Sequence, residues 1–174
     1  MSSKSKKPLV ILGSSRSDGN TRIAVEKVIA GRDIEVVDLS KLDISHYDYE
    51  NTNLEDDFIP LAEKMVEHDP IILATPVYWY TMSARMKVFI DRWTDLITVR
   101  KDLGRAMKGK KIFLVTSFGG EYPEGFEDPI SLTCKYLDME FRGFYPHYSG
   151  EDEEKRKESD SHLQNFIDRV WKGE

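Results

Sequence analysis

A polar loop near the start of the chain holds the residues whose types and spacing suggest chemistry most clearly. It spans residues 13–21, follows a short apolar run, and reads GSSRSDGNT. The loop offers several hydroxyl groups, one cation in Arg16, and the free backbone N–H groups of the helix expected to follow it. Donors and a counter-charge at a helix start are typical of a phosphate site, although such loops also form ordinary turns. The loop therefore predicts phosphate binding.

Two better-known phosphate loops do not match this segment. The dinucleotide fingerprint needs glycines at G-x-G-x-x-G spacing, but Ser15 and Asp18 occupy two of those positions. A Walker A loop needs a lysine before its final serine or threonine, and Asn20 stands there instead. The remaining interpretation is a terminal monophosphate that donor groups hold without a metal ion.

A second loop, residues 75–82, is unusual because it is aromatic. It reads TPVYWYTM and follows another apolar run. Three consecutive aromatic side chains are costly to expose, so they indicate either a subunit interface or a flat ligand stacked against them. A cap over the protein core is the structural alternative.

The two loops require elements that bring them to one place. Short apolar runs alternate with helical patterns, and several of these runs are apolar on both faces, which predicts a parallel sheet covered by helices on both sides. The fold class is therefore α/β and doubly wound, and ligands of such sheets bind beyond the carboxyl ends of the strands. Strands are expected at residues 9–12, 34–39, 71–74, 112–115 and, less regular, 141–148. Helices are expected at 23–29, 58–66, 86–97 with Ser83 as N-cap, 128–137 and 163–171.

Composition excludes several classes of protein. A length of 174 residues fits a single domain, 1–174, in which residues 1–7 are expected to form a disordered tail. The net charge of −6 argues against a nucleic-acid partner, and no apolar stretch approaches the ~20 residues of a membrane span. Cys134 is the single cysteine, which excludes an intrachain disulfide and a cysteine-rich metal site. The four histidines lack metal-ligand spacing, so no metal is expected. The protein is expected to be cytoplasmic.

The aromatic loop and the helix after it resemble the signature of the NAD(P)H-dependent FMN reductase family. The similar segment is residues 75–92, TPVYWYTMSARMKVFIDR. The polar loop at 13–21, the lysine-rich segment 107–111 and the Ser-Phe-Gly-Gly segment 117–120 are similar to other parts of the family pattern and occur in the same order. The resemblance spans roughly residues 8–120.

This resemblance implies a flavodoxin-like sheet of five parallel strands in the order 2-1-3-4-5, with non-covalently bound FMN. It implies that FMN passes electrons from NADH or NADPH to a small-molecule acceptor, and no catalytic side chain is needed because the chemistry belongs to FMN. Lys87 and Asp91 also match, but their i,i+4 spacing favours a structural ion pair, and Arg92 is likewise expected to be structural. The implied phosphate ligands are Ser14, Arg16, Asn20 and Thr21, and the implied ring contacts are Pro76, Val77, Tyr78, Trp79, Ser117, Gly119 and Gly120.

The family resemblance also implies a homodimer or homotetramer. The aromatic loop and the acidic connection at residues 40–56, which contains Tyr47 and Tyr49, are candidate interface segments, and the loop at 121–127 is a candidate gate. Two other functions occur on sheets of this topology. A flavodoxin-type electron carrier would use a phosphate loop without arginine, so Arg16 favours the reductase. A phosphoacceptor receiver domain would need paired acidic residues after the first strand, which the loop lacks.

Overall fold

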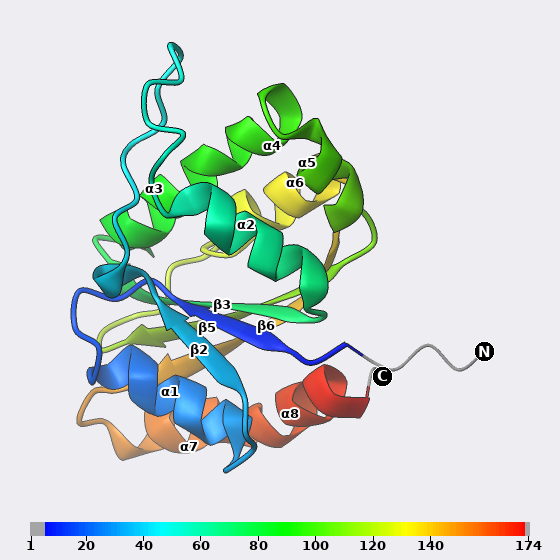
Figure 1. Cartoon of the computed structure of the whole chain (residues 1–174). Coiled ribbons are helices and arrows are strands. Elements are labelled where there is room, and N and C mark those ends of the chain that lie inside the picture. The colour runs from blue at the N-terminus through cyan, green and yellow to red at the C-terminus, as the bar shows by residue number, and fades with distance from the viewer. Residues whose placement is uncertain (1–5, 173–174) are drawn as a thin grey trace.

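The computed structural model describes residues 6–172, in which a parallel sheet lies between two layers of helices (Figure 1). Five strands run parallel in the order β2-β1-β3-β5-β6, which confirms the predicted order 2-1-3-4-5. A sixth strand, β4, pairs antiparallel with the end of β3 and was not predicted. The strands are β1 (Leu9–Leu12), β2 (Glu35–Asp38), β3 (Ile71–Tyr78), β4 (Thr81–Met82), β5 (Lys111–Phe118) and β6 (Glu140–Tyr148).

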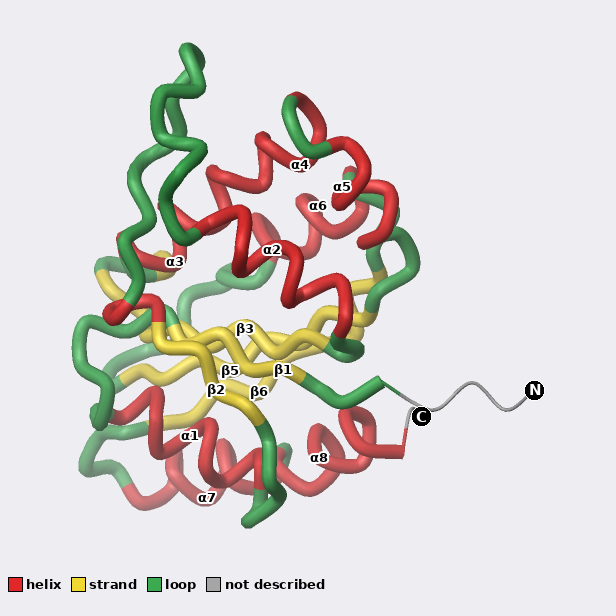
Figure 2. Tube along the Cα trace, in the orientation of Figure 1, coloured by secondary structure: helices red, strands yellow, loops and turns green. Residues whose placement is uncertain are grey.

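Helices cover both faces of the sheet, as Figure 2 shows. One layer holds α1 (Asn20–Ile29), α7 (Glu153–Ser161) and α8 (Leu163–Lys172). The other layer holds α2 (Phe58–Glu67), α3 (Ala84–Asp91), α4 (Asp95–Thr98), α5 (Lys101–Met107) and α6 (Asp128–Tyr136). Because the long strands are parallel, the loops that follow β1, β3 and β5 all leave the sheet at its carboxyl edge.

The apolar strands explain why two helical layers are needed. Leu9 and Ile11 of β1 belong to the core beneath α2 and α3, whereas Val10 and Leu12 belong to the core beneath α1 and α8. Alternate side chains of a strand point to opposite faces, so a strand that is apolar throughout is stable only between two apolar layers.

The helix predicted at residues 86–97 is not continuous, because a 3₁₀ turn interrupts it. The chain leaves α3 through a 3₁₀ turn at Arg92–Thr94, forms the short α4, and then forms α5, which was not predicted. Gly104 of α5 lies against α4 so closely that a Cβ there would be 2.1 Å from the carbonyl oxygen of Leu96. The helices can therefore pack only because residue 104 lacks a side chain, and Ile97 is left 40% exposed.

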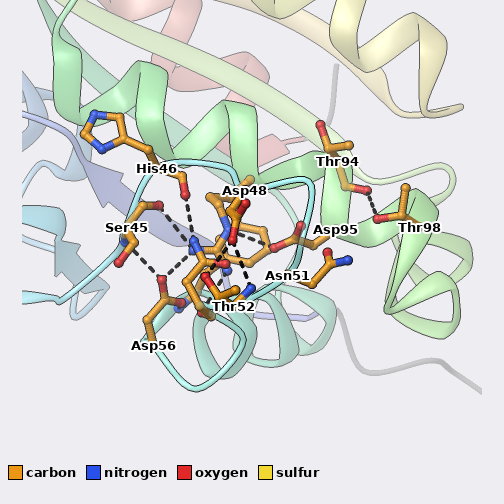
Figure 3. Close-up of polar contacts among 12 residues, drawn as sticks. Ser45, His46, Asp48, Asn51, Thr52, Asp56, Thr94, Asp95 and Thr98 are labelled. Atoms are coloured by element: carbon orange, nitrogen blue, oxygen red, sulfur yellow. Dashed lines mark hydrogen bonds and ion pairs between the residues drawn. The ribbon is translucent and has the colours of Figure 1, made fainter.

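The buried guanidinium of Arg92 ties the long connection between β2 and α2 to the body of the protein. Its partners Asp56 and Asp95 are labelled in Figure 3. It forms ion pairs with Asp56 and, at 2.8 Å, with Asp95. It also donates to the backbone carbonyls of Ser45 at 3.2 Å and Asn53 at 3.4 Å. Burial opposes the charged form, but the hydrogen bonds that the guanidinium donates to the two carboxylates prevail and raise the pKa of Arg92. The connection thus projects away from the helices (Figure 1), and its two ends are held by the contacts of Arg92 with Ser45, Asn53 and Asp56.

Two further predictions concern single residues. Lys87 and Asp91 form the predicted i,i+4 ion pair, with 2.5 Å between Nζ and Oδ1. Cys134 is fully buried, and burial raises the pKa of its thiol to about 12.

Most of the predicted disordered tail, residues 1–5, lies outside the described residues. The backbone carbonyl of Lys7 accepts a hydrogen bond from the Asp69 amide at 3.2 Å. No helix within residues 6–172 is long and apolar enough to cross a membrane.

Lys110 is a buried cation at the opposite, amino edge of the sheet. Its ammonium group donates to the carbonyl of Val66 at 2.8 Å and to that of His68, both at the end of α2. Burial, with a smaller effect of nearby Lys6, lowers the pKa of Lys110 to about 8. The folded protein therefore releases this proton at a lower pH than the unfolded chain does.

This difference predicts how stability depends on pH. Between about pH 8 and 10.5 the unfolded chain binds more protons at residue 110, so stability must rise with pH over this window. We expect the free energy of unfolding of the wild type to rise by at most about 3 kcal/mol relative to Lys110→Met across the window. Urea unfolding of both proteins at each pH measures the difference, in which other titrating groups cancel. A difference that is flat with pH would contradict the burial argument.

Candidate functional site

A pocket of about 230 Å³ lies at the carboxyl edge of the sheet, where the loops after β1, β3 and β5 meet. The end of β6 supplies a fourth side. Nine of the eleven residues predicted to hold FMN line this one pocket. The lining residues are Ser14, Arg16, Gly19, Asn20, Thr21, Pro76, Val77, Tyr78, Ser117, Phe118, Gly119 and Ser149.

Trp79 and Gly120 were also predicted as ring contacts, but neither is among the lining residues. Trp79 is 92% exposed and forms, with Tyr80, the two-residue turn between β3 and β4. The φ angles of these residues are 48° and 67°, in the left-handed region that such hairpin turns require and that asparagine or glycine usually occupies. The backbone therefore holds two aromatic side chains outward, beside the pocket rather than in it.

The start of α1 provides the donors that a phosphate group needs. Gly19 precedes the helix in an extended conformation, and no side chain among residues 6–172 caps this end. The first backbone bond runs from the amide of Ile23 to the carbonyl of Gly19 at 3.2 Å, so the amides of residues 20–22 precede the helical ladder. Together with the helix dipole and the cationic side chain of Arg16, these amides form an anion site. The donor set fits the phosphate of FMN.

Hydroxyl groups connect the first and third loops. The Oγ1 atom of Thr21 and the Oγ atom of Ser117 are 2.8 Å apart, and both residues are buried. The buried Oγ atom of Ser14 accepts a hydrogen bond from the amide of Arg16 at 3.3 Å, which leaves its own proton free to donate. Of the side chains expected to bind phosphate, those of Ser14 and Thr21 are thus held in place by hydrogen bonds within the protein.

Ser83 connects the first and second loops, and it is the N-cap of α3 as predicted. Its hydroxyl donates to the carbonyl of Gly13, and its oxygen accepts from the amide of Met86 at 3.1 Å. Its amide donates to Oγ1 of Thr75 at 3.0 Å. One buried serine therefore fixes the beginning of the phosphate loop, the end of β3 and the start of α3.

Removing this hydroxyl is expected to affect both stability and binding. Ser83→Ala loses the helix cap and leaves the buried Gly13 carbonyl without its donor, which costs about 1–3 kcal/mol of unfolding free energy. FMN affinity should also fall, because Gly13 starts the phosphate loop. Chemical denaturation and flavin titration measure the two effects. The exposed Ser161→Ala is the control and should change stability by less than about 0.5 kcal/mol. If Ser83→Ala and Ser161→Ala had equal unfolding free energies and equal FMN affinities, the role assigned to Ser83 would be contradicted.

Three lining residues were missed by the sequence analysis: Gly19, Phe118 and Ser149. The amide and the hydroxyl of Ser149 both donate to the carbonyl of Phe118, at 2.8 Å and 2.9 Å. Ser149 directly follows β6, so it lies at the same edge of the sheet as the other loops. Its position after a predicted strand could have identified it as a lining residue. The resemblance to the family pattern ends near residue 120, so it does not include Ser149.

The pocket contains binding groups rather than an acid–base pair. Among its lining residues, the ionisable side chains are those of Arg16 and Tyr78. Asp38, at the end of β2, lies next to the phosphate loop; burial raises the pKa of this carboxyl, but hydrogen bonds from Ser17 and Ser40 outweigh burial and lower it. The described residues contain no group of three or more side chains that could hold a metal ion. The arrangement can bind a phosphorylated planar molecule, and the bound molecule would supply the reaction chemistry.

Comparisons with known proteins agree with this geometry. The family model described as NADPH-dependent FMN reductase matches residues 7–125. YwqN of Bacillus subtilis, named as a candidate NAD(P)H-dependent FMN-containing oxidoreductase, is 30% identical over 147 residues, which cover 78% of this chain and 81% of the relative.

Solved structures are similar over almost the whole chain. The Trp repressor binding protein from Bacillus subtilis has a TM-score of 0.73 and 25% identity, covering 95% of this chain and 97% of the other. An FMN-dependent NADH-azoreductase from Bacillus anthracis, solved in complex with FMN, has a TM-score of 0.69 at 10% identity, covering 94% and 99%, and supports the fold alone. From the family match, the relative and the pocket together, we conclude that the chain belongs to the NADPH-dependent FMN reductase family, enzymes that use FMN with a reduced nicotinamide as co-substrate.

Proposed function

We propose that this oxidoreductase transfers electrons from NADH or NADPH, through FMN in the pocket at the carboxyl edge, to a small-molecule acceptor such as a free flavin or a quinone. The observation that carries the proposal is the uncapped start of α1 with Arg16 beside it, placed opposite the loops after β3 and β5. When bound, FMN supplies the redox chemistry, and the protein supplies binding and orientation.

The chain's own residues then have distinct tasks. Arg16 and the amides of residues 20–22 would hold the phosphate. Pro76, Val77 and Tyr78 would contact the ring from the loop after β3, and Gly119 would contact it from the loop after β5. A Cβ at Gly119 would meet only Ser149 Oγ, at 4.0 Å, so the missing side chain leaves room for a flat ring beside the backbone.

Anaerobic reduction tests the proposed activity directly. The FMN-loaded protein should lose its yellow absorbance within seconds of mixing with NADH or NADPH, and the colour should return when an acceptor is added. A protein that binds FMN but keeps its colour with both nicotinamides would instead be an electron carrier of the flavodoxin type.

We also propose that the chain works as a homodimer or homotetramer in the cytoplasm, with small molecules rather than nucleic acid or membrane as partners. Three large aromatic side chains support the self-association: Tyr49, Trp79 and Tyr80 are 85%, 92% and 73% exposed in the single chain. The backbone conformation holds Trp79 and Tyr80 outward, and such a surface is costly to leave in water. Sedimentation velocity at micromolar concentration should show dimer or tetramer, and only monomer would overturn this proposal.

A further inference from the structure

A second cavity of about 360 Å³ adjoins the cofactor pocket and shares Phe118 with it. It lies between the loop after β5, the end of β6 and helix α7. Its walls include Tyr122, Phe144 and Pro146 beside Phe118. A cavity of this size whose walls include three aromatic rings is typical of a small-molecule site, and the FMN ligands described above do not use it.

The aromatic walls are packed against one another. The rings of Tyr122 and Phe144 stack with centroids 5.7 Å apart and an interplanar angle of 5°. Phe118 meets Tyr122 edge-on at 5.2 Å and Tyr148 edge-on at 5.4 Å. Burial, with the neighbouring Glu127, raises the pKa of Tyr122 far above its usual range, so its phenol stays neutral. The aromatic part of the wall is therefore flat, uncharged and held by its neighbours, which suits a planar ring.

The rim of the cavity is unfavourable for an anion. Lys155 is already engaged in an ion pair with Glu121. Glu158 adds a second carboxylate, and His162 adds an imidazole. Carboxylates thus outnumber the ammonium group, and an incoming carboxylate or sulfonate would meet net repulsion at the entrance.

We propose that this cavity is the specificity pocket for the electron acceptor and takes the second, apolar ring of a planar aromatic compound without anionic groups. The reactive ring of such a molecule faces the cofactor pocket, and its second ring passes Phe118 into the cavity. This inference rests on the proposed function. For a naphthoquinone, a hydride from the nicotinamide and a proton from solvent reduce the two carbonyls to two hydroxyls, and the nicotinamide leaves oxidised.

Steady-state kinetics with three acceptors test the ring contact. The acceptors are menadione, benzoquinone and a naphthoquinone sulfonate. Phe144→Ala should raise the KM for menadione about tenfold with little change in kcat, and should leave benzoquinone, which lacks the second ring, unchanged. Tyr136→Ala removes an exposed aromatic ring outside both cavities and is the control. Equal effects of Phe144→Ala on menadione and benzoquinone would overturn the proposal.

Charge reversal at the rim tests the selectivity against anions. Glu158→Lys should raise kcat/KM for the sulfonate about fivefold and leave benzoquinone unchanged. Glu154→Lys makes the same change in net charge on the same helix but outside the cavity. It should therefore leave kcat/KM for the sulfonate unchanged. An identical gain in both variants would show a long-range charge effect and would overturn the rim assignment.

A binding measurement separates failure of this inference from failure of the proposed function. In the FMN-loaded protein, 2-naphthol, which cannot be reduced in this reaction, should shift the NMR signals of Phe118, Tyr122 and Phe144, and Phe144→Ala should weaken its binding. Shifts elsewhere only would overturn the specificity pocket, whatever the activity. Loss of NAD(P)H oxidation with every acceptor, ferricyanide included, would instead refute the proposed function.

Discussion

Replacing Arg16 by alanine is expected to weaken FMN binding by about tenfold to a hundredfold, with no change in the affinity for riboflavin. The guanidinium is the one cation among the residues that line the pocket, and it lies beside the uncapped start of α1. A charge-assisted hydrogen bond to phosphate contributes about 1.5–3 kcal/mol, which corresponds to this loss of affinity. Riboflavin has no phosphate, so its binding does not depend on this contact.

Quenching of flavin fluorescence measures both affinities in one format. Arg22→Ala is the matched control, because Arg22 lies in the first turn of the same helix but pairs with Glu26 at 2.6 Å and does not line the pocket. FMN affinity should be nearly unchanged in this control. If Arg16→Ala weakened riboflavin and FMN equally, the side chain would support the fold of the loop rather than bind phosphate.

Replacing Arg92 by methionine is expected to destabilise the protein by about 3–5 kcal/mol. The arginine side chain is fully buried, and its removal leaves the carboxylates of Asp56 and Asp95 buried without their cation. The carbonyls of Ser45 and Asn53 lose a donor as well. The guanidinium also lies 4.8 Å from the centre of the Phe58 ring, a packing contact that methionine replaces only in part.

Denaturant unfolding at neutral pH measures this loss. Lys87→Met is the control, since it breaks the exposed ion pair with Asp91 on the helix that precedes Arg92 and should cost about 0.5 kcal/mol or less. Limited proteolysis adds a local readout, because cleavage within residues 42–57 should become faster in Arg92→Met. Similar stabilities of the two variants would contradict the view that Arg92 fixes the base of the connection.

The sheet and most of the pocket could be predicted because their signals are local. Residues 9–12 and 71–74 are short, continuous apolar runs, a pattern that a buried parallel strand explains well. Parallel strands bring the loops after them to one edge, and the family resemblance implied which residues of these loops, among them Arg16, Tyr78 and Ser117, lie together. Ser83 had a recognisable capping position for the same reason.

The features that were missed depend on contacts between distant segments. Helix α5 has only Leu103 and Met107 as buried apolar residues, and Gly104 lowers its helix propensity while permitting its contact with α4. Arg92 was expected to be structural, but its partner Asp56 could not be identified because it lies on a separate segment. The outward turn at Trp79 likewise results from pairing of β3 with a two-residue strand that has no pattern of its own.

The central claim is that the loops at the carboxyl edge hold FMN and that the first of them anchors its phosphate. Calorimetric titration of the folded wild-type protein with FMN and with riboflavin tests this claim most directly. We expect one FMN bound per chain, with riboflavin bound at least about tenfold more weakly. No measurable uptake of FMN, or equal affinity for the two flavins, would contradict it.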